Sequence, residues 1–131
     1  MAKIRILIDT DIIIDSIKGV RAAKELFRAR AVDLYCSILT KEELLSKRGL
    51  KDSERKRIIT LLGRTKVLSI DEDINRKYMA LMRKYGETPN SIADYVIAAT
   101  AWSKKLPLLT RNRRHFEHLQ EIKLSPGYEI K

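Results

Sequence analysis

The chain has few of the residues that support secreted or membrane architectures. One cysteine, Cys36, among 131 residues excludes a disulfide framework and a thiolate zinc cluster, and it suits a reducing compartment. The longest apolar runs, such as Ile12-Ile13-Ile14, are too short to span a membrane. The first residues lead directly into a strand-like run without the apolar core of a signal peptide. We therefore expect a cytoplasmic protein with no membrane partner.

Amide side chains are also scarce, with one Gln and three Asn, whereas charged residues make up 34% of the chain. This composition suits a protein from a hot environment, where surface ion pairs are common. Lys and Arg outnumber Asp and Glu by 27 to 17, a formal net charge of +10. Heat stability does not require that excess, which also suits a polyanionic partner such as RNA, DNA or an acidic protein. Both interpretations remain open at this point.

Strand-like and helix-like segments alternate along the chain. A hydrophobic content of 44% excludes disorder, and the length predicts one domain over residues 1–131. The patterns predict strands over 4–8, 32–38, 66–70 and 106–110, and helices over about 11–18, 20–30, 40–48, 52–62, 71–85, 91–105 and 112–119. The tail offers a fifth strand at 122–124 or 128–130. The alternation predicts an α/β domain with a mainly parallel sheet.

Acidic and amide residues cluster where the predicted strands end. Asp9 and Asp11 follow the first strand, and Glu43 lies near the start of the helix after the second. Asp94 lies at the start of the helix that feeds the fourth strand, and Asn112 follows that strand. Ligand sites in open parallel sheets form at the carboxyl ends of the strands, so we expect these side chains at one edge.

Gathered carboxylates repel one another unless a cation lies among them, and oxygen ligands favour Mg²⁺ or Mn²⁺. Such an ion supports hydrolysis of a phosphodiester by an activated water. Each acid also has a structural explanation. Thr40 to Glu43 forms a capping box, Ser91 to Asp94 nearly repeats it, and Asp9, Asp11 and Asn112 suit turns or helix caps. Their coincidence at one edge favours the functional interpretation.

Four segments resemble the motifs of PIN domains, in order and at ordinary spacing. They are Leu7-Ile8-Asp9-Thr10-Asp11, Thr40-Lys41-Glu42-Glu43, Asp94 with the apolar run to Ala101, and Leu108-Leu109-Thr110-Arg111-Asn112. The length is most similar to VapC toxins of type II toxin–antitoxin pairs. The resemblance implies a five-stranded sheet in the order 3-2-1-4-5 and a Mg²⁺- or Mn²⁺-dependent ribonuclease. It also implies a homodimer and a small VapB-like antitoxin as partner.

The resemblance also assigns roles by position. It makes Asp9, Glu43 and Asp94 the catalytic metal ligands, with Thr110 as an accessory hydroxyl. Where the family often has a fourth acid, this chain has Asn112 at one candidate position and His115 at the other. Asn112 would be a neutral ligand, so the site would hold one metal, or hold a second one weakly. Asp11 stands where the family usually has Asn and adds a further acid near the site.

Basic residues flank the expected site. Arg111, Arg113 and Arg114 follow the fourth strand with no acid among them, so we expect them to contact RNA phosphates. Eight further basic residues lie from Lys47 to Lys66, where a solvated helix face is slightly favoured over phosphate contact.

Three other functions fit parts of the pattern. A housekeeping PIN nuclease of RNA maturation would have the same site, and a degenerate PIN fold that binds RNA or protein would have lost catalysis with its fourth acid. A phospho-receiver domain also has acids after its first strand, but Ser69-Ile70-Asp71 is a poor acceptor segment and the required Lys is not evident.

Overall fold

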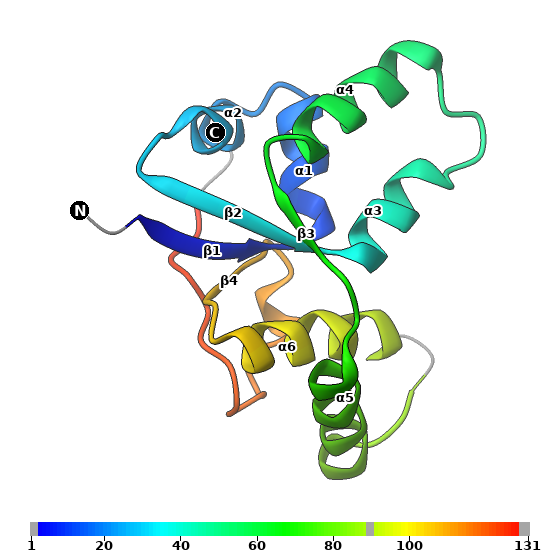
Figure 1. Ribbon diagram of the computed structural model, residues 1–131, viewed down its shortest axis with the longest axis vertical. Coiled ribbons are helices and arrows are strands. Elements are labelled where there is room, and N and C mark those ends of the chain that lie inside the picture. The colour runs from blue at the N-terminus through cyan, green and yellow to red at the C-terminus, as the bar shows by residue number, and fades with distance from the viewer. Residues whose placement is uncertain (1–2, 89–90, 129–131) are drawn as a thin grey trace.

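The computed structural model describes residues 3–88 and 91–128, in which strands and helices alternate (Figure 1). In chain order the elements are β1 (Ile4–Ile8), α1 (Thr10–Ile17), α2 (Arg21–Arg28), β2 (Val32–Ser37), α3 (Ile38–Leu45), α4 (Asp52–Leu62), β3 (Lys66–Leu68), α5 (Glu72–Tyr85), α6 (Ile92–Lys104), β4 (Leu108–Leu109) and the 3-10 turn η2 (Arg113–His115). The prediction of an α/β fold is confirmed.

The strands form one parallel sheet in the order β3-β2-β1-β4. The prediction of a fifth strand is wrong for the described residues, because 122–124 contributes only an isolated parallel bridge between Leu108 and Leu124. β4 is itself two residues long, and Pro126 has no N–H with which to extend the pairing. The other proposed segment, 128–130, lies mostly outside the described residues.

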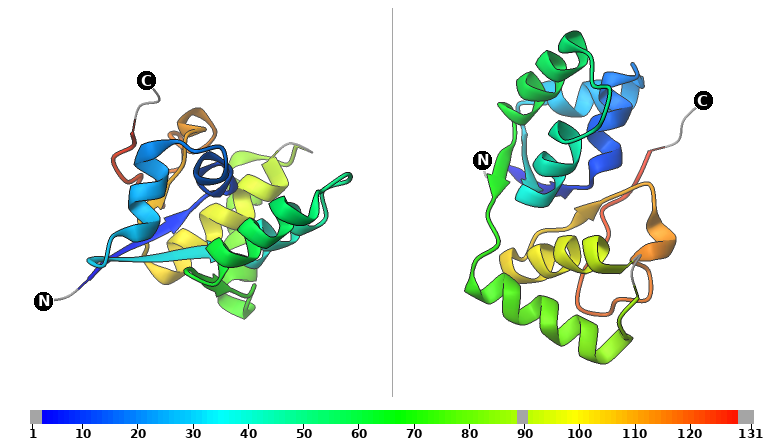
Figure 2. Two further views of the ribbon diagram at one scale, coloured as in Figure 1. Left: turned by 90° about the horizontal axis from the view of Figure 1, so that it is seen from above. Right: turned by 90° about the vertical axis from the view of Figure 1, so that its right-hand side faces the viewer.

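The sheet separates two hydrophobic cores. Leu7, Tyr35 and Leu108 point to one face and pack with residues of α5 and α6. Alternate strand residues such as Ile8 and Cys36 point to the other face and pack with α1 to α4. Figures 1 and 2 show this division, with α1 to α4 on one side of the sheet and α5 and α6 on the other. The period of two along each strand produces both cores.

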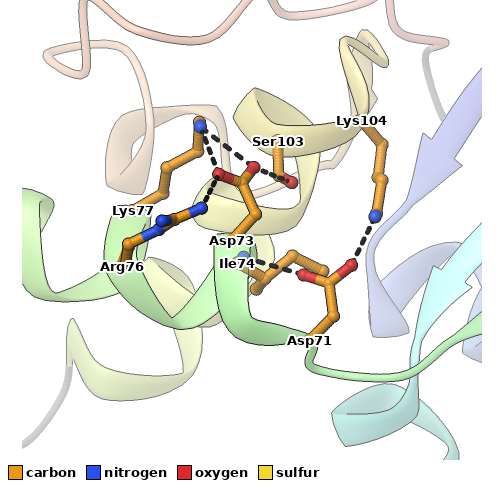
Figure 3. A network of polar contacts seen from close by, with 7 residues as sticks. All are labelled: Asp71, Asp73, Ile74, Arg76, Lys77, Ser103 and Lys104. Carbon is orange, nitrogen blue, oxygen red and sulfur yellow. Dashed lines mark hydrogen bonds and ion pairs between the residues drawn. The ribbon is translucent and has the colours of Figure 1, made fainter.

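Helix α6 lies between the sheet and α5 and is buried continuously from Tyr95 to Ala101. A polar network at its carboxyl end fastens it to α5 (Figure 3). Asp73 accepts hydrogen bonds from Ser103 and Lys77, and Asp71, the N-cap of α5, pairs with Lys104. The network therefore fixes α6 relative to α5 at the end opposite its first turn.

Several predicted boundaries change. Helix α3 begins at Ile38 rather than Thr40, because the Oγ of Ser37 accepts a hydrogen bond from the Leu39 backbone and caps the helix. The predicted helix over 112–119 is wrong, since only the short turn Arg113–His115 forms there. No helix of the described residues combines the length and apolarity that crossing a membrane requires.

Candidate active site at the carboxyl edge of the sheet

Asp9 lies at the carboxyl edge of the sheet. It follows β1 directly and is the N-cap of α1, where its Oδ1 accepts a hydrogen bond of 2.8 Å from the Thr10 backbone N–H. Its Oδ2 accepts a 2.8 Å hydrogen bond from the hydroxyl of Thr110, which is 1% exposed and follows β4. Asp9 is itself buried. The sequence offered Asp9 and Asp11 as turn or cap residues, and in the structure Asp9 is the N-cap.

Glu43 reaches the same edge from the second half of α3. Its Oε2 lies 3.3 Å from the hydroxyl oxygen of Thr10, which also lies 3.1 Å from that of Thr40. The predicted capping box is wrong, because Ser37 is the N-cap and Thr40 is already inside the helix. Glu43 therefore has no capping role, and its side chain lies at the pocket.

Asp94 lies in the first turn of α6, where its Oδ2 is 3.1 Å from Nδ1 of His115. The second predicted capping box is wrong as well: Ser91 makes no side-chain cap, and its hydroxyl bonds with Thr88 instead. The sequence marked His115 only as one of the two positions where the family often has its fourth acid, and its contact with Asp94 was not predicted.

Hydrogen bonds hold the segment after β4 against α1. The backbone N–H of Arg111 donates to Asp11 Oδ2 at 2.9 Å, and its guanidinium donates to Asp15 Oδ1 at 2.8 Å. The hydroxyl of Tyr128 donates to Asp15 Oδ2 at 2.8 Å. Asp15 and Tyr128 were not anticipated, since no motif marks a pairing between residues so far apart in sequence.

The three arginines expected at the site have different surroundings. Arg111 pairs with the buried Asp15, and Arg113 donates to the carbonyl of Ser125 at 2.8 Å. Arg114 is exposed. Two of the three guanidinium groups thus have protein partners in this structure, and their contact with phosphate stays a prediction.

These elements surround a pocket of about 280 Å³. Its polar lining consists of Asp9, Thr10, Asp11, Glu43, Asp94, Asn112 and His115. The pocket thus includes all four residues predicted as metal ligands, together with the accessory Asp11. Thr110 stands behind it, where its oxygen also accepts a 3.0 Å hydrogen bond from the Asn112 backbone N–H.

The surroundings of the pocket disfavour the ionised forms of the carboxyl groups that line it. Burial raises the pKa of Glu43 and of Asp94 above their usual range, and the nearby Asp9 adds to both shifts. Burial, with the charge of Asp9 next, raises the pKa of Asp11 to about 6. Asp11 Oδ1 is buried with no hydrogen-bond partner among the described residues. A cation in this pocket would relieve the repulsion and satisfy that oxygen.

The donors are carboxylate and amide oxygens, which suit a hard divalent ion. Within residues 3–88 and 91–128, no three His, Cys, Asp or Glu side chains are grouped tightly enough to hold a metal as they stand. The side chains line the pocket from separate elements instead. Such a site suits an ion that keeps several waters or takes ligands from a phosphate.

The sequence is similar to known ribonucleases. It is 34% identical over 122 residues to ribonuclease VapC10 of Mycobacterium tuberculosis, covering 90% of each chain. It is 32% identical over 123 residues to ribonuclease VapC1 of Methanocaldococcus jannaschii, covering 92% of this chain and 85% of the relative.

Solved structures share the fold. A toxin–antitoxin complex from Klebsiella pneumoniae contains a chain that matches with a TM-score of 0.75 at 28% identity, covering 94% of this chain and 99% of that one. The DNA-bound VapBC from Salmonella typhimurium matches with a TM-score of 0.68 at 25% identity, covering 95% and 98%. A model of the PIN domain matches residues 6–122, and the chain belongs to the PIN-domain family.

Proposed function

We propose that this chain is a metal-dependent endoribonuclease that acts as the toxin of a VapBC-type toxin–antitoxin pair. The observation that carries the proposal is the convergence of Asp9, Glu43 and Asp94 on one pocket from three separate elements. The similarity to VapC ribonucleases over nine-tenths of the chain supports the same activity.

Asp9, Glu43, Asp94 and Asn112 are the residues that would hold the metal, which we expect to be Mg²⁺ or Mn²⁺. When bound, the ion would supply a nucleophilic water and neutralise charge that develops on the phosphate. Asp11 is the accessory acid, because it lines the same pocket and has a buried oxygen with no hydrogen-bond partner among the described residues.

Neighbouring groups position these acids. The Thr110 hydroxyl orients Asp9, and the Thr10 hydroxyl orients Glu43. His115 stands beside Asp94 at the exposed side of the pocket, where its ring orients that carboxylate. Arg114 is the best placed of the three arginines to contact a phosphate, because the guanidinium groups of Arg111 and Arg113 are engaged with the protein.

The partners follow from the relatives. The Klebsiella pneumoniae structure is a toxin–antitoxin complex, which supports a VapB-like antitoxin for this chain. The same relatives favour a toxin over a housekeeping nuclease of RNA maturation or a non-catalytic binding module. A homodimer and a cytoplasmic location remain predictions.

The direct test is cleavage of a mixed RNA panel by the purified protein with Mn²⁺, Mg²⁺ or EDTA. Asp94→Asn removes one proposed ligand, and Asp52→Asn is the matched control, because Asp52 is an exposed acid in the first turn of α4. We expect metal-dependent cleavage by the wild type and the control, and the EDTA background for Asp94→Asn. Cleavage that survives EDTA or Asp94→Asn would contradict the proposal.

A further inference from the structure

A strongly basic cleft lies on the α1 to α4 side of the sheet, away from the acidic pocket. It has a volume of about 600 Å³ and lies among the end of α1, α2 and α4, which lie together on that side (Figure 2). Six cationic side chains line it, and no acidic residue does: Lys18, Lys24, Arg28, Lys56, Arg57 and Arg64.

These cations lack acidic partners within the described part of the chain, where none of the six forms an ion pair. Some cations elsewhere do pair, for example Arg21 with Glu25 and Lys84 with Glu121. Lys24 and Arg28 also lie four residues apart on α2, a spacing at which like charges destabilise a helix. An unpaired cluster of this kind is suited to an anionic ligand.

A third cavity lies along α1 between the basic cleft and the acidic pocket, and we refer to the three cavities together as the groove. Thr10, Ile14 and Glu43 line both the third cavity and the acidic pocket, and Ile17 and Lys18 line both the third cavity and the basic cleft. Lys47 and Glu54 also line the third cavity. Its walls are partly apolar. The eight residues of α1 span about 12 Å, a length that a few nucleotides of a single strand can cover.

We propose that the basic cleft binds backbone phosphates of the same RNA strand whose scissile phosphate lies in the acidic pocket, a few nucleotides away. The inference rests on the proposed function. A strand of regularly spaced phosphates accounts for both ends of the groove, by direct contact with cations at one end and through a metal at the other. An acidic peptide would account for the basic end alone.

The test is RNA binding by the full chain in EDTA, where no metal-dependent cleavage occurs. The probe is a labelled 12-nucleotide oligouridylate (the 12-mer), and its binding is followed by fluorescence anisotropy. The cleft variant is Arg28→Gln/Arg57→Gln/Arg64→Gln. The control, Arg83→Gln/Lys105→Gln/Lys123→Gln, removes the same charge from exposed positions outside the groove. Thermal melts establish that both variants are folded.

We expect the cleft variant to bind the 12-mer at least about tenfold more weakly. We also expect its slope of log K against log salt to be less negative by about 2, the value for three phosphates on a single strand. The control should lose less than about threefold. An equal loss of affinity in both variants, or an unchanged 12-mer affinity in the cleft variant, would overturn the proposal that the cleft binds RNA. Loss of binding to a labelled oligoglutamate with unchanged RNA binding would also overturn it, in favour of a protein-docking site.

The two proposals can fail separately. If the wild type cleaves RNA with metal while the cleft variant binds RNA like the control, the cleft is refuted and the nuclease stands. If the cleft variant selectively loses binding while no RNA is cleaved, the cleft stands as an RNA-binding surface and the nuclease is refuted.

Discussion

Asp9 combines a structural and a chemical role at one position. One oxygen caps α1 and the other accepts the hydroxyl of Thr110, so the carboxylate is held between the ends of β1 and β4. A buried carboxylate needs such partners, because an unpaired charge in the interior is costly. The same restraint fixes the direction in which Asp9 meets a ligand in the pocket.

Thr110→Val would leave Asp9 Oδ2 without its buried donor. We expect the free energy of unfolding to fall by about 1–3 kcal/mol and the cleavage rate to fall at least about tenfold, because the unsatisfied group loses its partner and its orientation. Urea unfolding and initial cleavage rates measure both effects. Thr110→Ser keeps the hydroxyl and should stay close to the wild type. Equal activity in the Val and Ser variants would show that the hydrogen bond does not orient Asp9.

Asn112→Asp should strengthen metal binding, because it adds a carboxylate to a pocket that the neutral Asn112 lines. We expect the Kd for Mn²⁺ to fall about tenfold, equivalent to about 1.4 kcal/mol, in isothermal titration calorimetry. Gln120→Glu adds the same charge at an exposed position outside the pocket and is the control. A similar gain in both variants would mean that overall charge, rather than the pocket, sets the affinity.

At the scale of elements, α6 determines where Asp94 lies. The helix is buried along most of its length, and its far end is fastened to α5 through Asp73 and Asp71 (Figure 3). Because the helix is rigid, the attachment of its far end also fixes the position of its first turn. Residues outside the pocket therefore contribute to its geometry.

Asp73 makes the α5–α6 connection dependent on pH. Hydrogen bonds from Ser103, Lys77 and Arg76 lower its pKa from 3.8 to about 2, so its ionised form stabilises the fold. That contribution is fully present above the unfolded value of 3.8 and is lost as the pH falls through about 2. We expect Asp73→Asn to be less stable than the wild type at pH 7 and the difference to shrink between pH 4 and pH 2. Thermal melts across this range measure the difference.

Glu72→Gln is the control for that experiment, because Glu72 is the exposed neighbour of Asp73 on the same turn. Its stability relative to the wild type should change little between pH 4 and pH 2. A difference between Asp73→Asn and the wild type that stays constant over this range would contradict the assignment.

At the scale of the whole molecule, the net charge of +10 is unevenly distributed. Acids gather at the pocket beside the carboxyl ends of the strands, and unpaired cations gather at the cleft beyond α1. This separation suits a polyanion that binds a metal at one end of the groove and cations at the other.

RNA affinity should therefore fall steeply with salt. For the wild type in EDTA, we expect log K for the 12-nucleotide RNA to fall against log salt with a slope between about −2 and −4, as three to six phosphates are neutralised. Anisotropy titrations from 50 to 200 mM KCl, the interval over which such losses are large, measure it. An oligomer with uncharged methylphosphonate linkages should give a slope near zero. Similar slopes for the two ligands would rule out phosphate contacts.

Much of the fold could be predicted from local patterns. The bounds of β1 and α4 match the predictions, since an apolar run of β-branched residues and an amphipathic segment ending before Gly63 each specify one local structure. The segments after β4 could not be predicted in this way. Their pairing with Leu108 and the contacts of Arg113 depend on tertiary neighbours rather than on a local pattern.

The sequence by itself determined the alternation of strands and helices, the membership of the PIN family and the identity of the acids, because these depend on periodicity and on motifs in fixed order. Only the tertiary structure decided which side chains serve the pocket. Glu43 has no capping role because α3 begins at Ile38 with Ser37 as its N-cap, His115 lies beside Asp94, and Arg111 pairs with Asp15. Such contacts join residues far apart in the chain, and their geometry exists only once the sheet has brought the ends of its strands together.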